Sequence, residues 1–420
     1  MGSVRSLVFA TITALALGVA CAGTEAGQTP DLEWPQYGGG PTHDNFRRVA
    51  NAVKWPKVLW RVPAAQGQPT IGGGFLYAGG ESLFKIDPNT GKVVASFAVG
   101  GTGRARVAYA PTLTTTSVIA HSADGRVFAI DRDLKTVAWK WEGPAFQDPR
   151  WSGVLADDGH YVLAAGGAVV ALSPASGAVL WRMELEPGER VSTTPAAHGG
   201  RVFLGTERGR FLAVELATGR PAWVNKGPSS YVVTSPVVAF GKVFVGDRGV
   251  AGLRTGAVNA FDVAKGDLVW STEFGATGFS TPGVVVDDRG GQRIVAGFGQ
   301  SVALFDVKTG ERAAEPEIAT GRNAFGSPTV VGDTIYFGNL DGHLYAHDLV
   351  TGALRWALQM PPVPEGRHPN QVGDFTYAHD RLYVSTSIGL LAIGQDPEKT
   401  TAPEGFVLEW TDPDAKPEGR

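Results

Sequence analysis

The stretch Asp262–Trp270 (DVAKGDLVW) decides the fold, because versions of it recur along the whole chain. An acidic or small polar residue opens each copy, Gly occupies the fifth position in all but one, and Trp follows four residues later in most. The copies are Asp87–Gly91, Asp131–Trp139, Ser173–Trp181, Glu215–Trp223, Asp262–Trp270, Asp306–Gly310 and Asp348–Trp356. Their fifth positions are 44, 42, 42, 47, 44 and 42 residues apart. A period of about 40 to 50 residues is typical of the blades of a β-propeller.

Each repeat is predicted to fold into four short strands. In the second repeat, residues 111–114, 118–121, 126–131 and 136–141 are short, largely apolar runs separated by turn residues. The opening acidic side chain can accept backbone N–H groups in a tight turn, and Gly supplies the positive φ angle that such a turn needs. The Trp is expected to lie on the outermost strand and to pack between neighbouring blades. We therefore interpret these Asp and Trp residues as structural and not catalytic.

Counting the strands predicts how the ring closes. Eight inner sets of three strands begin near Pro69, Pro111, Gly153, Pro195, Pro236, Pro282, Pro328 and Gln371. Eight outer strands lie at Trp60, Ala95, Trp139, Trp181, Trp223, Trp270, Ala314 and Trp356. Trp60 precedes the first inner set, and no turn motif follows the last one. The segment Val58–Val62 is therefore expected to complete the last blade and to hide the open edges. The sequence predicts an all-β, eight-bladed β-propeller over residues 57–394.

The composition agrees with a large all-β protein and excludes several other classes. The 420 residues include 57 Gly, 27 Pro and one Cys, with 43% hydrophobic and 10% aromatic residues. A chain with this apolar content can bury a large core and is not disordered. A net charge of −4 gives no reason to expect a nucleic-acid surface. One Cys excludes an intramolecular disulfide and a Cys-rich metal site.

Residues 1–20 are predicted to be a signal peptide. Arg5 is the only charge among the first 24 residues, and Leu7–Leu17 is an apolar run of 11, too short to span a bilayer. One cleavage position lies before Cys21, whose thiol would then be lipidated, although Gly18 stands where such sites usually carry a large aliphatic residue. The other lies after Ala22 and would remove the Cys. We expect an outer-membrane lipoprotein facing the periplasm, with a soluble periplasmic or secreted protein as the alternative.

The remaining parts of the chain flank the propeller. Residues 21–56 are interpreted as a lipoprotein linker and an N-terminal lead-in, in which Asp31–Arg48 is loop-like and too polar and Gly-rich for a strand pair. Residues 395–420 are rich in Pro and charge and are expected to form a loose tail, in which Phe406–Trp410 could dock. No later stretch is apolar enough to span a membrane, so membrane attachment would depend on acyl chains at Cys21.

Three features together resemble one known family. These are the Trp-containing repeat closed by Asp-x-x-Thr-Gly, the opening Trp34-Pro-Gln-Tyr-Gly38, and Val58-Leu-Trp-Arg61. They are similar to the pyrroloquinoline-quinone-like (PQQ-like) repeat propellers over residues 34–394. One branch of that family contains quinoprotein alcohol and glucose dehydrogenases. Another contains the non-enzymatic, eight-bladed lipoprotein propeller of the outer-membrane β-barrel assembly machinery. The resemblance implies the fold strongly and the function only weakly, because function depends on individual sites.

The two branches imply different residues, and the assembly branch agrees better with this sequence. Many alcohol-oxidising members carry a vicinal Cys-Cys disulfide, which one Cys cannot form. They also place Glu, Asn and Asp around Ca²⁺; Asn323 and Asn370 lie in suitable loops, but no acidic residue can be assigned with them. We therefore expect no catalytic, cofactor-binding or metal-binding residues. PQQ with Ca²⁺, in a quinoprotein dehydrogenase or a PQQ-binding protein, is the alternative.

Other catalytic motifs are absent from the sequence. It contains no G-x-x-x-x-G-K-[S/T], G-x-S-x-G or H-E-x-x-H motif. His343 and His347 are expected to share one face of a strand, but no third metal ligand can be named for them. They are interpreted as surface or packing residues.

The strongest candidate for a site is a set of loops that should emerge around the central channel on one face of the ring. These loops lead from each outer strand to the next inner strand, and the long turn Asp247–Gly256 should open on the same face. Arg and aromatic residues are common binding anchors. The candidate residues are Arg104, Arg106, Tyr109, Arg150, Trp151, Arg190, Tyr231, Arg248, Arg254, Phe279, Arg322, Asn323, Phe325 and Arg367, with His368 beside them.

Two interpretations of these loops remain open. Glu142, Asp148, Glu186, Glu189, Glu207 and Asp247 lie among the arginines, so one interpretation is solvated loop arginines offset by nearby acids. The other is a binding face for a protein partner or an anionic ligand, and the resemblance points to the β-barrel assembly machinery as that partner. The exposed edges of the blades offer strand addition as a second binding mode. A polysaccharide partner is a further possibility, and we expect a monomer.

Overall fold

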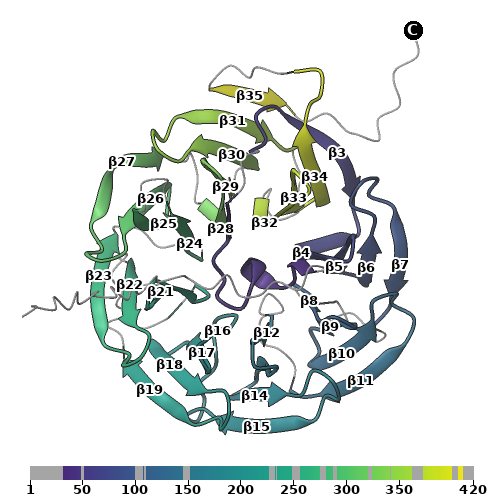
Figure 1. The fold of residues 1–420 in the computed structure, drawn as a ribbon, viewed down its shortest axis with the longest axis vertical. Helices are drawn as coiled ribbons and strands as arrows, with labels where there is room; N and C mark the ends of the chain where they lie inside the picture. Colours follow the sequence, from purple (N-terminus) through teal and green to yellow (C-terminus); the bar gives the residue numbers. More distant parts are fainter. Residues whose placement is uncertain are drawn as a thin grey trace, which may run out of the picture.

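The computed structural model shows an all-β ring of sheets around a central axis (Figure 1). It describes residues 32–48, 52–99, 107, 110–144, 152–226, 232, 234–247, 256–274, 281–286, 291–319, 324–340, 342–361, 372–399 and 405–409. Within these ranges the regular structure consists of strands and one short 3-10 helix, η1 (Tyr37–Gly39).

Seven sheets are each built around four consecutive antiparallel strands and form blades 1 to 7. Blade 1 contains β4 (Ala65–Gly72), β5 (Phe75–Gly80), β6 (Leu83–Ile86) and β7 (Val93–Phe97); blade 2 contains β8 (Thr112–Leu113), β9 (Ser117–His121), β10 (Arg126–Asp131) and β11 (Val137–Glu142). Blade 3 contains β12 (Val154–Leu155), β13 (Tyr161–Ala165), β14 (Ala168–Leu172) and β15 (Val179–Glu184); blade 4 contains β16 (Ala196–His198), β17 (Arg201–Gly205), β18 (Arg210–Glu215) and β19 (Pro221–Lys226). Blade 5 contains β20 (Val237–Ala239), β21 (Lys242–Asp247), β22 (Gly256–Asp262) and β23 (Leu268–Phe274). Blade 6 contains β24 (Gly283–Val286), β25 (Gln292–Phe298), β26 (Ser301–Asp306) and β27 (Arg312–Ala319); blade 7 contains β28 (Ala324–Val331), β29 (Thr334–Asn339), β30 (His343–Asp348) and β31 (Leu354–Gln359).

The remaining sheet is a composite that joins the two ends of the chain. It pairs β3 (Pro56–Val62) with β34 (Gly389–Gln395), followed inward by β33 (Arg381–Thr386) and β32 (Val372–Ala378). This closing sheet contains the strand that the sequence assigned to closure, and Figure 1 shows β3 beside β34. The prediction of eight blades is wrong: among the described strands, seven blades built from continuous repeats form the ring, and a composite sheet closes it. The physical reason is that only seven turn motifs occur, so β32–β34 have no outer strand of their own.

Neighbouring blades dock through the Trp residues of the repeat, as the sequence predicted. In five repeats the indole N–H of one blade donates to a backbone carbonyl in the turn of the next blade, and the turn Gly lies against the same ring. A Cβ atom on Gly310, for example, would lie 2.4 Å from the Trp270 ring. The pairs are Trp60 with Gly91, Trp139 with Gly177, Trp181 with Gly219, Trp223 with Gly266, and Trp270 with Gly310. The repeated Gly is therefore required both for its positive φ and for this close approach.

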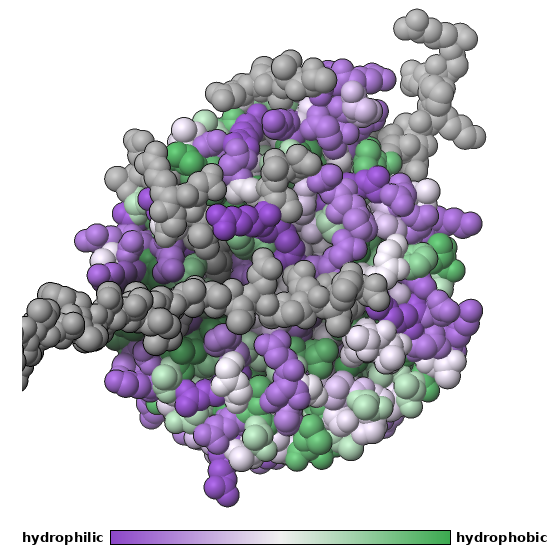
Figure 2. Space-filling view, in the orientation of Figure 1, coloured by the Kyte–Doolittle hydropathy of each residue, from purple (hydrophilic) through white to green (hydrophobic). Residues whose placement is uncertain are grey.

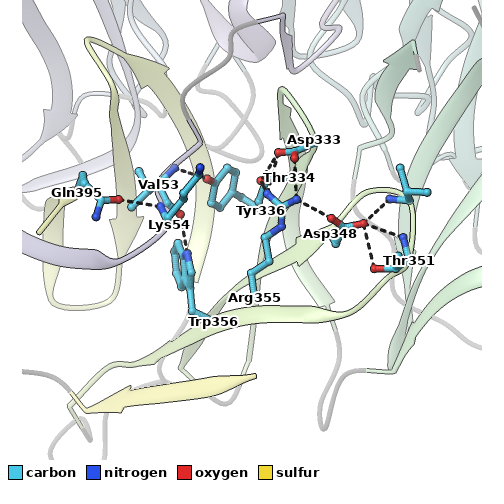
Figure 3. Close-up of polar contacts among 11 residues, drawn as sticks. Val53, Lys54, Asp333, Thr334, Tyr336, Asp348, Thr351, Arg355, Trp356 and Gln395 are labelled. Carbon is cyan, nitrogen blue, oxygen red and sulfur yellow. Dashed lines mark hydrogen bonds and ion pairs between the residues drawn. The ribbon is translucent and has the colours of Figure 1, made fainter. Parts of the chain in front are cut away.

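The contact between blade 7 and the closing sheet uses a different segment, shown in Figure 3. The Trp356 indole donates to the Val53 carbonyl at 2.7 Å, and the Val53 N–H donates to the Tyr336 hydroxyl at 2.9 Å. The Gln395 side-chain oxygen accepts the backbone N–H groups of Lys54 and Trp55. Residues 53–55 thus take the place of the missing turn motif at this one junction.

Candidate functional site

The two ends of the ring carry different connections. Within a blade the first-to-second and third-to-fourth strands are joined at one end, which includes the Asp-x-x-Thr-Gly turns; we call it the turn face. The second-to-third connections, and the loops that lead to the next blade, lie at the opposite end, which we call the loop face. This follows from the antiparallel order of the strands in blades 1 to 7. The strand ends from which the predicted Arg and aromatic loops leave, where they are described, lie at the loop face.

The N-terminal lead-in, residues 32–48, lies across the turn end of the central channel. The sequence suggested a loop here, but β1 (Leu32–Trp34) pairs with the end of β4, and β2 (Phe46–Arg47) pairs in parallel with the end of β28. Between them, carbonyl oxygens of the lead-in accept backbone N–H groups from three innermost strands. These bonds join Leu113 to Pro35, Ala197 to Pro41, and Val238 to Thr42, at 2.7, 2.7 and 2.9 Å. The lead-in therefore satisfies the inner edges of most blades and closes that end of the ring.

Side chains of the lead-in extend these contacts. Gln36 is 4% exposed and its amide pairs with the backbone of Leu155, accepting the N–H at 2.8 Å and donating to the carbonyl at 3.1 Å. The Gln36 amide thus occupies the place that a paired strand residue would have beside β12. The Tyr37 hydroxyl donates to Thr281 Oγ1 at 3.0 Å and lies 3.1 Å from Ser327 Oγ. Burial, together with the nearby Asp374 carboxylate, raises the pKa of Tyr37.

A belt of buried hydroxyl groups surrounds the channel at its loop end. Each residue of the belt stands just before or at the start of an innermost strand and accepts the backbone N–H of the corresponding residue in the neighbouring blade. Ser152 accepts from Ala110, Thr194 from Ser152, Ser235 from Thr194, and Thr281 from Ser235, at 3.0 to 3.2 Å. In the closing sheet Asp374 Oδ1 takes this role and accepts the backbone N–H of Ser327. The belt fixes the bases of the loops that lie on the loop face.

One of these loops is described in full: it leads from β15 in blade 3 to β16 in blade 4. Glu189 is 1% exposed, and its carboxylate accepts hydrogen bonds from Thr206 Oγ1 and Arg210 Nη1, both at 2.6 Å. Arg210 also forms an ion pair with Glu186 at 2.9 Å. The Arg190 carbonyl accepts the Glu207 N–H at 3.0 Å, while the residue itself is exposed. The loop is therefore tied to the β17–β18 turn from two sides and presents Arg190 at the surface.

Blade 5 repeats part of this arrangement. Asp247 ends β21, is 2% exposed, and accepts a hydrogen bond from Asn259 Nδ2 at 2.5 Å. An isolated backbone bridge joins it to Val232, as another joins Thr206 to Val191 in blade 4. The connection that begins after Asp247 is the predicted long turn with Arg248 and Arg254, which lies outside the described residues.

Most predicted site residues fall outside the part of the chain that the structure describes. Arg190 is the member of the set whose surroundings are described. Phe325 lies in β28, paired through its backbone with Gly338, and nothing is described of its side chain. The residues outside the description are Cys21, Arg104, Arg106, Tyr109, Arg150, Trp151, Tyr231, Arg248, Arg254, Phe279, Arg322, Asn323 and Arg367.

The described His, Cys, Asp and Glu side chains form no cluster of the kind that holds a metal ion. His347 lies on β30 with Nδ1 2.8 Å from the Gly352 carbonyl, and its ring stacks on Phe337. The His343 ring stacks on Tyr345. Both histidines thus pack against aromatic neighbours. The same described residues form no helix long and apolar enough to cross a membrane.

The sequence analysis missed the lead-in contacts and the hydroxyl belt. The belt had a readable signal, because Ser or Thr immediately precedes Pro at Thr194, Ser235, Thr281 and Ser327, once in each of four successive repeats. The roles of Gln36 and Tyr37 had no such signal, because each is a single residue whose partners lie 119 or more positions away.

The space-filling view in Figure 2 shows hydrophilic and hydrophobic residues interspersed over its coloured surface. The ring, its closing strand and the lead-in across the turn end define a repeat β-propeller.

Comparison with known proteins agrees with this class. A family model described as "Outer membrane protein assembly factor BamB" matches residues 52–165 and 165–386, so the chain belongs to this family of PQQ-like repeat propellers. The assembly factor BamB of Shewanella oneidensis is 23% identical over 87% of this chain and 88% of its own length. The crystal structure of BamB from Moraxella catarrhalis has a TM-score of 0.58 at 17% identity, covering 83% of this chain and 99% of the other.

Quinoprotein enzymes also match, over a shorter part. The quinohemoprotein alcohol dehydrogenase ADH IIB of Pseudomonas putida is 33% identical over 24% of this chain, and the match spans 17% of the enzyme's length. The crystal structure of quinohemoprotein alcohol dehydrogenase from Comamonas testosteroni has a TM-score of 0.63 at 13% identity, covering 91% of this chain and 82% of the other, so the likeness in fold extends over most of the ring.

Proposed function

We propose that this chain is an exported, non-enzymatic propeller scaffold that binds a protein partner through its loop face and assists the assembly of outer-membrane β-barrel proteins. The observation that carries the proposal is the blade 4 loop, in which the buried Glu189–Arg210 pair fixes Arg190 at the surface of the loop face. A buried carboxylate paired with Arg is costly to desolvate, so its presence under an exposed loop favours a role in holding that loop in one conformation.

The closure of the turn end supports the loop face as the binding surface. Residues 32–48 occupy the turn end of the channel and hydrogen-bond to the innermost strands there. The loop face is left as the end at which the innermost strands of the blades begin. Arg in fixed positions is enriched among the residues that dominate protein–protein binding. The family match adds that related propellers are described as assembly factors.

Export and anchoring belong to the proposal. The predicted signal peptide, residues 1–20, ends immediately before Cys21, and we propose that this residue is lipidated and tethers the ring to the outer membrane on its periplasmic side. Mass spectrometry of the intact mature chain tests the anchor, because lipidation adds acyl chains to Cys21. A mature mass that begins at Gly23 would contradict it.

Affinity capture from detergent-solubilised envelope tests the partner. The tagged mature chain is expected to enrich components of the β-barrel assembly machinery, and an Arg190→Glu variant is expected to enrich less of them. Equal capture by the variant, with its fold intact by circular dichroism, would contradict the choice of the loop face.

The quinoprotein dehydrogenase remains the alternative, supported by the partial match to ADH IIB. The loop residues Asn323 and Asn370, named above for a Ca²⁺ site, lie outside the described residues, so we derive no catalytic step. Dye reduction with added PQQ and Ca²⁺ separates the two functions: a flat trace at saturating cofactor agrees with the scaffold, and calcium-dependent turnover would favour the enzyme.

A further inference from the structure

The outer edge of blade 7 carries a strand that does not belong to the repeat. The C-terminal strand β35 (Phe406–Glu409) adds to β31 in parallel, with Trp356 opposite Phe406 and Leu358 opposite Leu408. The Gly405 N–H donates to the Leu354 carbonyl at 2.7 Å. The sequence predicted a loose tail in which Phe406–Trp410 could dock, and residues 406–409 do dock, as a strand. Figure 1 shows β35 outside β31, beyond the circumference of the ring.

Side chains hold this strand in a preformed site. Phe406 stacks on Trp55 with ring centroids 4.5 Å apart and an interplanar angle of 20°. The Lys399 ammonium lies 4.2 Å from the centroid of the same Trp55 ring. Phe406 and Leu408 pack against the hydrophobic cluster of blade 7 and the closing sheet, whereas Val407 between them is 57% exposed. The site therefore recognises an aromatic residue and an aliphatic residue two positions later.

Ring closure does not depend on this strand, because β3 already closes the ring against β34. In the described part of the chain, β31 is also the one outermost blade strand with a further strand on its outer side. The residue after the docking Trp is exposed Lys140 in β11 and exposed Arg182 in β15, and such charges hinder strand addition. The same position is uncharged in β31 (Ala357), β19 (Val224) and β23 (Ser271), which leaves these edges accessible to another strand. Among the described strands, β31 is the one of the three that has an added strand.

We propose that the β31 edge, together with Trp55, is an acceptor site for an extended segment of a partner polypeptide, and that β35 occupies it in cis. The partner segment carries an aromatic residue and, two positions later, an aliphatic one, as one face of an amphipathic β-strand does. It adds in parallel, with its main chain on β31 and its aromatic ring on Trp55. This site lies on the outer circumference and is independent of the proposed loop face.

The covalent link between β35 and the ring determines how strongly β35 competes with a partner segment. A short link between two binding segments gives the second binding event an effective concentration of about 1 mM. If β35 itself binds the vacant edge with an intrinsic Kd of about 100 μM, its occupancy in cis weakens the apparent affinity of a partner segment about tenfold. The tail thus restricts the site to segments that bind better than β35 or that are present at high local concentration.

The test uses the full-length chain and a labelled peptide with the sequence of residues 403–411 (PEGFVLEWT). In the release variant, Phe406→Asp and Leu408→Asp remove the two side chains that hold β35. The matched control is Val407→Asp, which places a charge on the same strand at an exposed position. Fluorescence anisotropy measures peptide binding, and circular dichroism with thermal unfolding checks that each variant is folded.

The proposal predicts saturable binding to the release variant and at least tenfold weaker binding to the wild type and to Val407→Asp. A peptide carrying Phe406→Asp should not bind, and Trp55→Ala in the release variant should weaken binding, with Trp55→Phe restoring it. No binding to the release variant would overturn the acceptor site. Equal binding to the wild type would overturn the occupancy in cis. Equal binding of a scrambled peptide would overturn the recognised pattern, and none of these outcomes bears on the loop face.

Discussion

The docking of each turn Gly under the preceding Trp predicts a large difference between two otherwise similar Gly→Ala substitutions. Gly310 and Gly241 both have φ of +72°, so a side chain is strained by the backbone equally at either position. A Cβ atom on Gly310 would lie 2.4 Å from the Trp270 ring, whereas one on Gly241 would meet nothing within 4 Å. The pair therefore separates backbone strain from blade docking.

The magnitudes follow from the contacts. The left-handed conformation costs an Ala residue about 1–2 kcal/mol at each position. At Gly310 the added methyl group also pushes Trp270 away, with an overpacking cost of about 1–3 kcal/mol. The displaced indole loses its 3.0 Å hydrogen bond to the Val307 carbonyl, which contributes about 1 kcal/mol. We expect Gly310→Ala to lower the free energy of unfolding by about 4 kcal/mol and Gly241→Ala by about 1–2 kcal/mol.

Urea unfolding followed by circular dichroism measures both values, with the denaturant slope checked for each variant. A loss of similar size in the two variants would refute the reasoning, because it would mean that backbone strain alone decides the cost. A further Trp270→Phe substitution serves as a test of the docking contact: it should reduce the difference between the two Ala variants.

Three other predictions concern buried polar groups. Gln36→Ala leaves the Leu155 backbone without its amide partner and should lower the free energy of unfolding by about 3 kcal/mol. Gln66 is exposed, so Gln66→Ala should lower it by less than about 0.5 kcal/mol in the same urea assay. Equal losses in the two variants would contradict the role of Gln36 beside β12. Burial lowers the pKa of His43 to about 4 and that of His121 to about 3, from 6.5 in the unfolded chain, so the unfolded state binds more protons below pH 6.5. The neutral histidines therefore contribute their full stabilisation above pH 6.5, and the free energy of unfolding falls by about 3 kcal/mol for each histidine as the pH drops towards 4. A free energy of unfolding that stays constant between pH 7 and 4.5 would contradict this prediction. Glu189→Ala leaves Arg210 without its buried partner and should cost about 3 kcal/mol, and thermal unfolding that matches the wild type would rule this out.

The repeat could be predicted from sequence because its determinants are local. Each Asp-x-x-Thr-Gly turn and its following Trp lie within nine residues, and the closing strand around Trp60 followed from counting these units. The lead-in could not be predicted in the same way. Its strands are two or three residues long, and Gln36 acts as a substitute strand residue for a blade 119 positions away. Periodicity does not reveal such single contacts.

The same contrast applies to the candidate site. The prediction of Arg-containing loops rests on composition and strand order, and apart from Arg190 and Phe325 its residues lie outside the described part of the chain. The buried Glu189 was counted among the acids that offset the arginines. The structure shows that it holds its loop, because its carboxylate accepts from Thr206 and Arg210 on the neighbouring turn. Sequence alone does not distinguish a solvated acid from a buried one when both lie in a polar loop.

The central claim is that the loop face binds a protein of the β-barrel assembly machinery, and two exposed arginines of blade 4 test it most directly. Arg190 lies at the loop end and Arg220 follows the turn motif at the opposite end. Surface plasmon resonance measures the affinity of the mature chain for the purified, reconstituted machinery. The account predicts that Arg190→Glu weakens binding at least tenfold, while Arg220→Glu stays within twofold of the wild type. Equal affinities for the two variants, or no measurable binding by the wild type, would contradict it.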